Sequence, residues 1–326
     1  MAINVGEVKR RLQALLNDDN MVNEYIRQYG PKMDIKYIKA IKESRASAES
    51  RIGEDGSGED PVYEIKLGCP VCEKEDVTCY ELRAKSQQVI QNKFLVPHYE
   101  GASGYKTIDY NLLSVTVCPR CLFASPDKKD FTRSASSGQG KQKSQLTGNM
   151  IMTLQEKIGE RKALLKAVVD YENYFQRPRI DDVAIAAYQL AMLRANVEAY
   201  YEQPYSLYKL GAYALRIAKI IKDSGGDNRE SYRDALGYFE EAFRTSNCPS
   251  EEIEMQVIYT IITLYLKLGE FKKANSYIGV FTNIKNDRKN EMRDNPRLTT
   301  ATIDKWADKA KRLWEDREEE DLFKDE

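Results

Sequence analysis

The chain has 326 residues, of which 42% are hydrophobic and 31% charged, and its formal net charge is −1. Such a composition belongs to a protein that forms a hydrophobic core, and the length leaves room for roughly two or three domains. Because the charges balance, no global field recruits nucleic acid or an anionic membrane surface. No apolar run approaches the roughly 20 residues that a membrane-spanning helix needs.

The N-terminus and the cysteines indicate the compartment. The first residues, Met1 to Glu7, contain no basic stretch followed by an apolar one, so a secretory signal is not expected. Four of the six cysteines stand in closely spaced pairs, which favours reduced thiols kept for metal binding over a disulfide framework. The sequence therefore predicts a cytoplasmic protein without membrane insertion.

Residues 1–45 are predicted to form an N-terminal helical segment, interrupted at Gly30-Pro31 because proline disfavours helix in the residue before it. Apolar residues recur along it at helical spacing, namely Val5, Val8, Leu12, Leu15, Leu16, Val22, Tyr25, Ile26, Tyr29, Ile35, Ile38 and Ile41. A small helical subdomain is expected, with a docking element as the alternative. Residues 46–61 are acidic and glycine-rich and are predicted to be a linker, since they lack the alternating ligands of a calcium-binding loop.

Two CPxC motifs, one from Cys69 to Cys72 and one from Cys118 to Cys121, lie within residues 62–124. Each places two thiols on one tight turn, and the two turns together offer the four sulfur ligands that structural zinc prefers. Alternating segments, Val62–Leu67 and Leu113–Val117, run directly into the motifs. Strands that deliver cysteine turns are typical of zinc ribbons, so residues 62–124 are predicted to be a zinc-ribbon-like head.

The predicted metal is a structural Zn²⁺, and its predicted ligands are Cys69, Cys72, Cys118 and Cys121. A shell of four thiolates leaves no open position for water, which argues against a catalytic metal. A redox role for either CxxC pair would need a βαβ context, and neither flank has one. Unbound or redox-active thiols are the alternative to zinc.

Three further residues could take part in the same chemistry. Cys79 lies in an expected strand, Val77–Leu82, where cysteine behaves as a small buried hydrophobe, and Cys248 lies at a repeat boundary. His98 is the only histidine, and its neighbours complete no catalytic motif. All three are expected to pack rather than to bind metal. Since dinucleotide, phosphate-loop and HExxH patterns are also missing, the sequence predicts no enzymatic function.

Residues 125–149 are rich in Ser, Gly, Lys and Gln, with few apolar anchors after Phe131, and are predicted to be a flexible tether. Residues 150–314 are predicted to be a helical domain, in which a small residue is followed at fixed spacing by a large one. The three copies of this pattern are Ala184/Tyr188/Ala191, Ala235/Phe239/Ala242 and Ala274/Ile278/Phe281. The pattern is typical of the second helix of a tetratricopeptide repeat, where the small residue permits close helix approach.

Only the third copy, Met255 to Ile284, fits the repeat along both helices, with its turn at Gly269. Pro204 and Pro249 stand near repeat boundaries, and the segment from Asp223 to Arg229 is an insertion. An apolar stripe predicts a capping helix, formed by Ile303, Trp306, Ala310, Leu313 and Trp314. Residues 315–326 carry eight acidic and two basic residues, and are expected to be a solvated tail, with an interaction role as the alternative.

The stretch from Asp109 to Ala124, the pair Asp130-Phe131 and the helix from Asp182 to Ala191 resemble an uncharacterised bacterial family of unknown function. Members of that family have two CPxC knuckles followed by helices of tetratricopeptide type. The resemblance covers roughly residues 62–290, implies zinc ligation by the same four cysteines, and supplies no reaction. The chain departs from the pattern at Glu73 and Leu122, where glycine often follows the second cysteine because positive φ costs it little, so altered turns are expected.

Together these features predict a mainly α fold, with a small β-containing zinc-ribbon head and a tetratricopeptide-like α-helical repeat domain. The leading hypothesis is a non-enzymatic scaffold or adaptor that binds protein partners along the helical surface. Tyrosines are expected mostly to pack and in part to line the groove, namely Tyr200, Tyr201, Tyr205, Tyr208 and Tyr213.

Two alternatives stand beside the adaptor. A nucleic-acid-binding zinc ribbon is supported by the basic tether with Phe131 and by basic residues of the head, namely Arg83, Lys85, Lys93 and Arg120. It is opposed by the neutral net charge and the acidic tail. A scaffold on the cytoplasmic side of a cell-envelope or motility machine rests on analogy with other repeat proteins alone.

Overall fold

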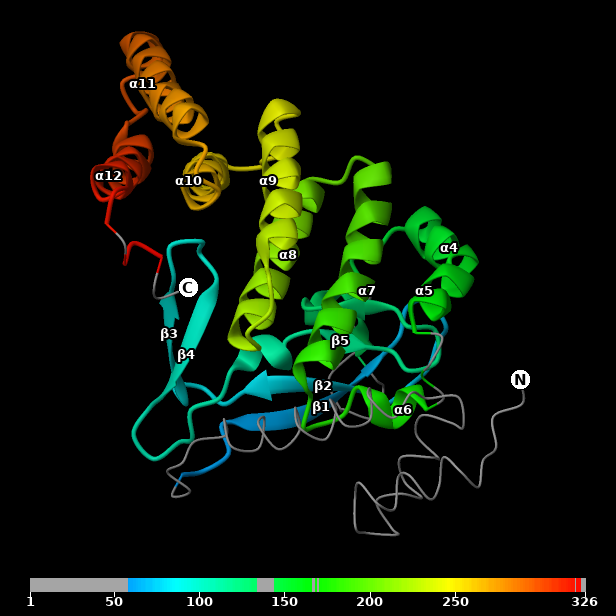
Figure 1. Cartoon of the computed structure of the whole chain (residues 1–326). Coiled ribbons are helices and arrows are strands. Elements are labelled where there is room, and N and C mark those ends of the chain that lie inside the picture. The colour runs from blue at the N-terminus through cyan, green and yellow to red at the C-terminus, as the bar shows by residue number, and fades with distance from the viewer. Residues whose placement is uncertain (1–57, 134–143, 166–167, 169, 320, 324–326) are drawn as a thin grey trace, which may run out of the picture. The chain divides into compact units, whose positions relative to one another are not determined.

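The computed structural model describes residues 58–133, 144–165, 168, 170–319 and 321–323. They form a mainly α structure with small antiparallel β pairs, as the sequence predicts (Figure 1). The predicted N-terminal helices and most of the predicted linker lie outside the described residues. Within the described part of the chain, no helix is long and apolar enough to cross a membrane.

The strands are β1 (Val62–Gly68), β2 (Val77–Leu82), β3 (Gln87–Gln91), β4 (Pro97–Gly101), β5 (Thr116–Val117), β6 (Ala124–Ser125) and β7 (Thr132–Arg133). The α-helices of the described residues are α4 (Gly148–Glu156), α5 (Ile158–Leu164), α6 (Tyr171–Tyr174), α7 (Asp181–Tyr200), α8 (Ser206–Asp223), α9 (Arg229–Arg244), α10 (Glu251–Lys267), α11 (Phe271–Asp294) and α12 (Ala301–Glu315).

The described residues form two compact units. The first contains residues up to Val89 together with Tyr99–Arg194, and the second contains Ile90–His98 and the chain from Ala195 onward. The β3–β4 hairpin and α7 therefore contribute to both. This division differs from the predicted domains, because α4, α5, α6 and most of α7 belong to the same unit as the cysteine head instead of to the helical repeat.

The first unit is built on the three-stranded antiparallel sheet β2-β1-β7. The predicted strands before Cys69 and around Cys79 are confirmed, and they pair so that Ile65 lies opposite Cys79. The predicted strand Leu113–Val117 is wrong in most of its length. A 3-10 turn at Tyr110–Leu112 precedes it, and only the two residues of β5 pair, with β6.

Helical residues anchor the loops of the head through buried hydrogen bonds. Arg179 is fully buried and donates to the carbonyl oxygen of Val115 at 2.8 Å and to that of Phe175 at 2.8 Å. On α7, the buried Tyr188 hydroxyl donates to the Asn111 carbonyl oxygen at 3.1 Å and lies 2.7 Å from the Ser114 hydroxyl. Since backbone groups lose water when buried, these donors replace the hydration that the loop carbonyls give up.

The flexible tether expected at 125–149 is packed in its described parts. Asp130 and Arg194 form a buried ion pair at 2.9 Å, with side chains 4% and 1% exposed. Phe131 is buried against Phe123, their ring centroids being 5.0 Å apart in an edge-to-face arrangement, and Leu146 is buried as well. Composition predicted a tether because the segment is mostly polar. A single ion pair and two buried apolar side chains are enough to hold such a segment in place, and composition does not reveal them.

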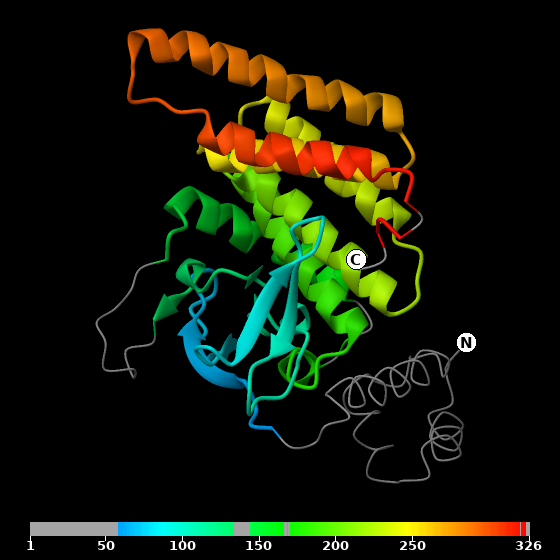
Figure 2. The same cartoon turned by 90° about the vertical axis from the view of Figure 1, so that its left-hand side faces the viewer.

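The second unit is a stack of helices in which α8 packs on α9, α9 on α10, and α10 on both α11 and α12. Figure 2 shows α10, α11 and α12 lying side by side. The predicted small positions Ala235, Ala242 and Ala274 are each fully buried, as is the large residue Phe239. In the third copy the large residue Ile278 is half-buried, and Phe281 after it is buried. The helix predicted from the last apolar stripe is present as α12, and its stripe is buried except for Trp314, which is half-buried.

The predicted helix–turn–helix around Gly269 is present. Gly269 has φ +77°, the left-handed conformation that glycine adopts without steric cost, and its N–H donates to the Leu266 carbonyl oxygen at 3.1 Å. The next N–H, of Glu270, donates to the carbonyl oxygen of Tyr265 at 2.8 Å, and α11 begins at Phe271. The loop thereby satisfies the last carbonyl groups of α10.

The C-terminal tail is not a wholly solvated end. Past α12, Leu322 is buried with 5% of its surface exposed, and Phe323 is half-buried. The acidic composition predicted solvation correctly for neighbours such as Glu318 and Asp321, which are exposed. It gave no weight to the two apolar residues that follow them.

Substitution of two glycines, one on α8 and one on α9, tests how closely these helices pack. A Cβ added at Gly211 would lie 2.7 Å from Cζ of the Phe239 ring, whereas one at the exposed Gly237 of α9 would meet nothing within 4 Å. We expect Gly211→Ala to lower the free energy of unfolding by about 1–3 kcal/mol through overpacking. Gly237→Ala should raise it by about 0.5–1 kcal/mol, because alanine favours helix. Urea unfolding measures both, and equal shifts in one direction would contradict this packing.

Candidate metal centre

The two CPxC turns have the same backbone geometry. In the first, the Cys69 N–H donates to the Lys74 carbonyl oxygen at 2.8 Å and the Glu73 N–H returns to the Cys69 carbonyl oxygen at 3.0 Å. In the second, the Cys118 N–H donates to Phe123 and the Leu122 N–H to Cys118, both at 2.8 Å. Each turn therefore presents its two thiols on a knuckle closed by two hydrogen bonds.

The residue after each second cysteine takes the left-handed conformation although it is not glycine. Glu73 has φ 58° and Leu122 has φ 59°. Such a conformation costs a non-glycine residue roughly 1–2 kcal/mol. The departure from glycine thus leaves the two turns alike and adds strain to each. Leu122 offsets its strain by complete burial, whereas Glu73 is exposed.

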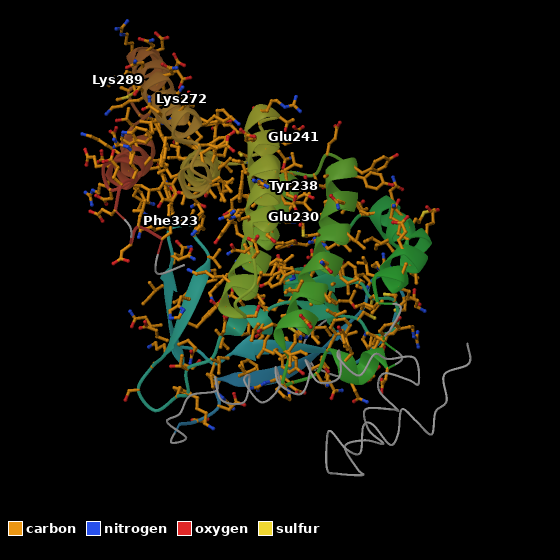
Figure 3. The ribbon with its side chains drawn as sticks, viewed as in Figure 1. Glu230, Tyr238, Glu241, Lys272, Lys289 and Phe323 are labelled. Atoms are coloured by element: carbon orange, nitrogen blue, oxygen red, sulfur yellow. The ribbon has the colours of Figure 1, made fainter. Side chains whose placement is uncertain are left out.

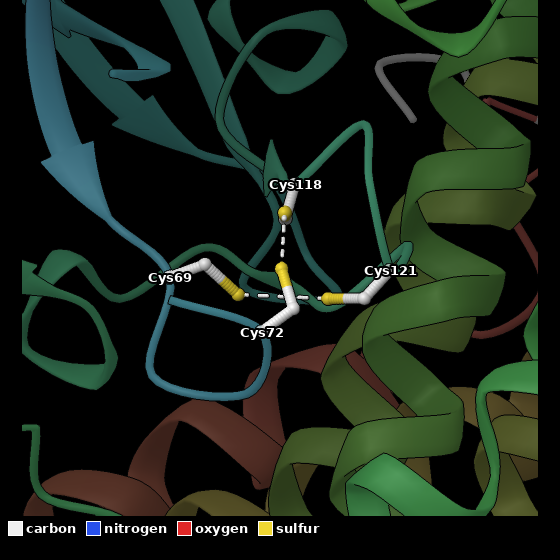
Figure 4. A group of neighbouring side chains, drawn as sticks. All are labelled: Cys69, Cys72, Cys118 and Cys121. Atoms are coloured by element: carbon white, nitrogen blue, oxygen red, sulfur yellow. Dashed lines mark hydrogen bonds between the residues drawn. The ribbon is translucent and has the colours of Figure 1, made fainter. Parts of the chain in front are cut away.

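The knuckles bring all four predicted ligand residues together, as Figure 4 shows. Their sulfur atoms lie within 4.8 Å of one another, and the Cys69–Cys121 and Cys72–Cys118 sulfur pairs are each 3.5 Å apart (Figure 4). Zinc–sulfur bonds of about 2.3 Å in a tetrahedron require sulfur separations of about 3.8 Å. A disulfide requires about 2.05 Å. The cluster has the dimensions of a metal site, and all four cysteines are free thiols.

The four cysteines lie in a largely buried site, so all four thiols can ionise together only if a cation neutralises their charge. Cys69, Cys118 and Cys121 are at most 2% exposed. Hydrogen bonds from the Cys121 and Cys69 thiols lower the pKa of Cys118 to about 2, while the hydrogen bond to the Cys118 sulfur raises the pKa values of Cys69 and Cys121. One thiolate is therefore stabilised by its neighbours. Several thiolates in so small a volume repel one another unless a metal ion neutralises them.

A buried arginine lies against the second knuckle. The Nε of Arg161, on α5, donates to the Cys121 carbonyl oxygen at 2.9 Å, and its guanidinium also donates to the Leu154 carbonyl oxygen at 2.7 Å. Arg161 is 1% exposed, and the negative charges that act on it come from the cysteines of the cluster. Burial lowers its pKa, and the negative charge of the cysteines acts in the opposite direction. Its positive charge therefore complements an ionised sulfur cluster.

Helical residues hold both knuckles in place. The side chain of Gln155, on α4, donates to the Val71 carbonyl oxygen of the first knuckle at 2.8 Å. The Arg120 side chain of the second knuckle donates to the Cys72 carbonyl oxygen of the first at 3.2 Å. Together with Arg161, these contacts orient the peptide groups that carry the sulfur ligands, as hydrogen bonds around metal sites commonly do.

The other residues considered as ligands lie outside the cluster. Cys79 is buried in β2, where burial raises the pKa of its thiol, and Cys248 is half-buried after α9. His98 is exposed on β4. None of the three belongs to the group of metal-ligating side chains found among the described residues.

Sequence reasoning missed Arg161 and Gln155 completely. Arg161 stands beside Lys162, which is exposed, in a segment whose charges resemble an ordinary solvated helix face. Only the folded position of α5 distinguishes the two. The conspicuous signal, the pair of CPxC motifs, identified the sulfur donors but carried no information about what surrounds them.

Comparison with known protein families identifies the family of this chain. Residues 62–306 match the model of the family described as an uncharacterized protein conserved in bacteria (DUF2225), and the chain belongs to this family. The match begins at β1 and ends within α12, so it includes the cysteine cluster and nearly all of the described helices. No curated protein and no solved structure gives a significant match.

The strain of the two knuckles can be measured by placing glycine after each motif. In metal-loaded protein, we expect Glu73→Gly to raise the free energy of unfolding by up to about 1 kcal/mol, because it relieves the left-handed strain at an exposed position. Leu122→Gly relieves the same strain but removes a fully buried side chain, and should lower the free energy by about 2 kcal/mol or more. Chemical denaturation checks the opposite signs. Destabilisation by both substitutions would show that the first knuckle does not need the left-handed conformation.

Proposed function

We propose that this member of the family is a non-enzymatic cytoplasmic adaptor, in which a structural Zn²⁺ stabilises the head and a tetratricopeptide-like helical surface binds protein partners. The observation that carries the proposal is the stack α8–α12, in which buried small residues at helix contacts leave the opposite faces to solvent. Helical arrays of this kind present extended surfaces to peptide segments of other proteins.

The donor set favours zinc over other common cations. Four thiolate sulfurs are soft ligands, which bind Zn²⁺ well and Mg²⁺ or Ca²⁺ poorly. Cys69 and Cys72 would hold the ion from the first knuckle, and Cys118 and Cys121 from the second. When bound, Zn²⁺ would supply charge neutralisation and a cross-link between two turns separated by 45 residues of chain. Since four sulfurs complete its preferred shell, the ion would have no position left for a substrate.

The exposed tyrosine at the end of α7 supports partner binding. Tyr200 is 78% exposed, far more than the other large apolar side chains of the described residues, whereas Tyr213 in α8 is buried. Tyrosine is enriched at the centres of protein–protein interfaces, where its ring supplies apolar contact and its hydroxyl a hydrogen bond. Of the other predicted tyrosines, Tyr201, Tyr205 and Tyr208 are half-buried, so Tyr200 is the one that offers its ring to a partner.

A protein partner is favoured over nucleic acid by the positions of the residues that suggested nucleic acid. Phe131 is 1% exposed, so its ring does not present a face to a base. Arg83 and Arg120 donate to backbone carbonyl oxygens of their own chain, as does Lys93. These three side chains are engaged within the chain, although Lys85 is exposed, and the net charge of −1 adds no long-range attraction.

The metal is tested by matched cysteine substitutions in the full chain. We expect one Zn²⁺ per wild-type chain by elemental analysis, and less than a tenth of that in Cys121→Ser, with a large fall in melting temperature because the binding free energy of a structural zinc adds to folding. The control is Cys79→Ser, which alters an equally buried cysteine outside the cluster and should keep the metal. Retention of a full equivalent by Cys121→Ser would rule out the four-cysteine site.

Partner binding is tested by affinity capture with the intact chain, because separating residues 62–124 from the helices would remove Arg161, Arg179 and Tyr188. From nuclease-treated lysate of the native bacterium, wild type should recover a discrete protein. Tyr200→Ala should recover it at least several-fold less, with an unchanged melting temperature, since exposed side chains contribute little to stability. Recovery that depends on intact nucleic acid and falls steeply with salt would instead establish the nucleic-acid alternative.

A further inference from the structure

The end of the chain occupies a site in the second unit that is built from four separate segments. Phe323 stacks on Phe94, with ring centroids 5.6 Å apart, and Phe94 stacks in turn on Tyr232 of α9 at 5.0 Å. Both Phe94 and Tyr232 are 2% exposed, and Leu322 beside them is 5% exposed. Figure 3 shows Phe323 next to the tip of the β3–β4 hairpin. The Phe323 ring thus extends an aromatic stack of the second unit, and Leu322 before it in the chain is buried.

Lysines from three of these segments surround the tail. The ammonium group of Lys93, beside Phe94 in the hairpin, donates to the Leu322 carbonyl oxygen, and that of Lys222 on α8 lies 3.5 Å from the Phe323 carbonyl oxygen. Lys267 of α10 lies over the Phe323 ring at 5.2 Å from its centroid. We call the five residues Lys93, Phe94, Lys222, Tyr232 and Lys267 the tail site.

The hairpin presents Phe94 in a fixed orientation. The side-chain oxygen of Asn92 accepts from the Phe94 N–H at 3.0 Å and from the Val96 N–H at 2.9 Å. Leu95, between them, has φ 60°, a left-handed conformation that costs a non-glycine residue energy and persists where surrounding contacts hold it. A binding surface held in this way loses little conformational entropy when a peptide docks.

The chemistry of the tail site is suited to a class of peptide and not only to this tail. Its aromatic face takes the phenylalanine ring, the leucine before it is buried, and two of its lysines bond backbone carbonyl oxygens that any peptide has. In the tail, the leucine–phenylalanine pair follows an acidic run from Glu318 to Asp321, whose charge is opposite to that of the lysines. A segment of another protein with acidic residues followed by Leu-Phe offers the same groups.

We propose that the tail site is an exchangeable peptide-binding site for acidic Leu-Phe segments of partner proteins, and that the chain's own tail occupies it until a partner displaces it. The inference deepens the proposed adaptor function and rests on it, since it names the kind of partner segment and the place where it binds. Leu322 lies only seven residues beyond the last residue of α12 (Glu315), so the tail has a high local concentration at the site. A partner segment must compete against that concentration.

Displacement is tested with a fluorescein-labelled peptide that has the sequence of residues 315–326. The full chain carrying Leu322→Ala and Phe323→Ala has its own ligand groups removed, and we expect the peptide to bind it at least tenfold more tightly than wild type in fluorescence anisotropy. Adding Phe94→Ala to this variant should abolish binding. A matched control, Phe271→Ala, alters an aromatic residue 44% exposed on α11 and should leave binding unchanged.

The peptide supplies a second control, because a version with alanines in place of its leucine and phenylalanine should not bind. Failure of the unaltered peptide to bind the folded double variant would overturn the proposal. So would a large loss of melting temperature in that variant, since the tail would then be a fixed part of the core. Concentration-dependent dimers of wild type that disappear in the double variant would make a second copy the occupant instead.

The outcome is separable from that of the adaptor proposal. If the peptide does not bind while Tyr200-dependent capture succeeds, the tail site is wrong and the adaptor stands. If the peptide binds with the expected dependence on Phe94 and capture recovers no protein, the site is real and the adaptor proposal fails.

Discussion

The first unit depends on the confinement of four sulfur atoms to a volume that water hardly enters. The two knuckles are separated by 45 residues of sequence, yet their sulfurs lie within 4.8 Å of one another, and three of the four cysteines are almost fully buried. Burial of several ionisable thiols is unfavourable unless opposite charge is supplied. The chain supplies part of it through the guanidinium of Arg161, fixed by two backbone carbonyl oxygens, and the sulfur geometry leaves room for a metal ion to supply the remainder.

The cysteine head and the helices that follow it belong to one compact unit. Few residues near the second knuckle pair in strands, since β5 and β6 have two residues each. Many backbone carbonyl groups there therefore have no partner in a sheet. Side chains from the following helices complete the loops: Gln155 and Arg161 at the knuckles, and Arg179 and Tyr188 at the loop before the second knuckle. Loss of one partner from a buried ionic contact such as Asp130–Arg194 typically costs about 3–5 kcal/mol. Polar contacts of this kind bind the helices to the head more specifically than apolar packing does.

A feature could be predicted from the sequence where it depends on neighbouring residues, and could not where it depends on residues far away in the chain. The cysteine turns, β1, β2 and the small residues of the helices depend on neighbours within one turn or one strand, and the sequence pattern identified them correctly. Arg161, the Asp130–Arg194 pair and the docking of Leu322 depend on residues 40 or more positions away. In sequence, each of them looks like an ordinary charged helix face, a polar tether or an acidic end. Composition predicts how a segment behaves in isolation, whereas the structure of these segments depends on their contacts with distant residues.

The tail site shows how an apolar binding surface can be kept in an otherwise well-solvated protein. An empty site would expose the rings of Phe94 and Tyr232, which the tail helps to bury, and unprotected aromatic surface promotes non-specific association. A resident segment covers this surface with only two side chains, a small contact that a partner can replace. The acidic residues before Leu322 keep the segment soluble when it is released. When it is bound, their negative charge is opposite to that of the lysines of the tail site. The short connection from α12 sets the affinity that a competing segment must exceed, so selectivity for a partner follows from the strength of the tail's own contact.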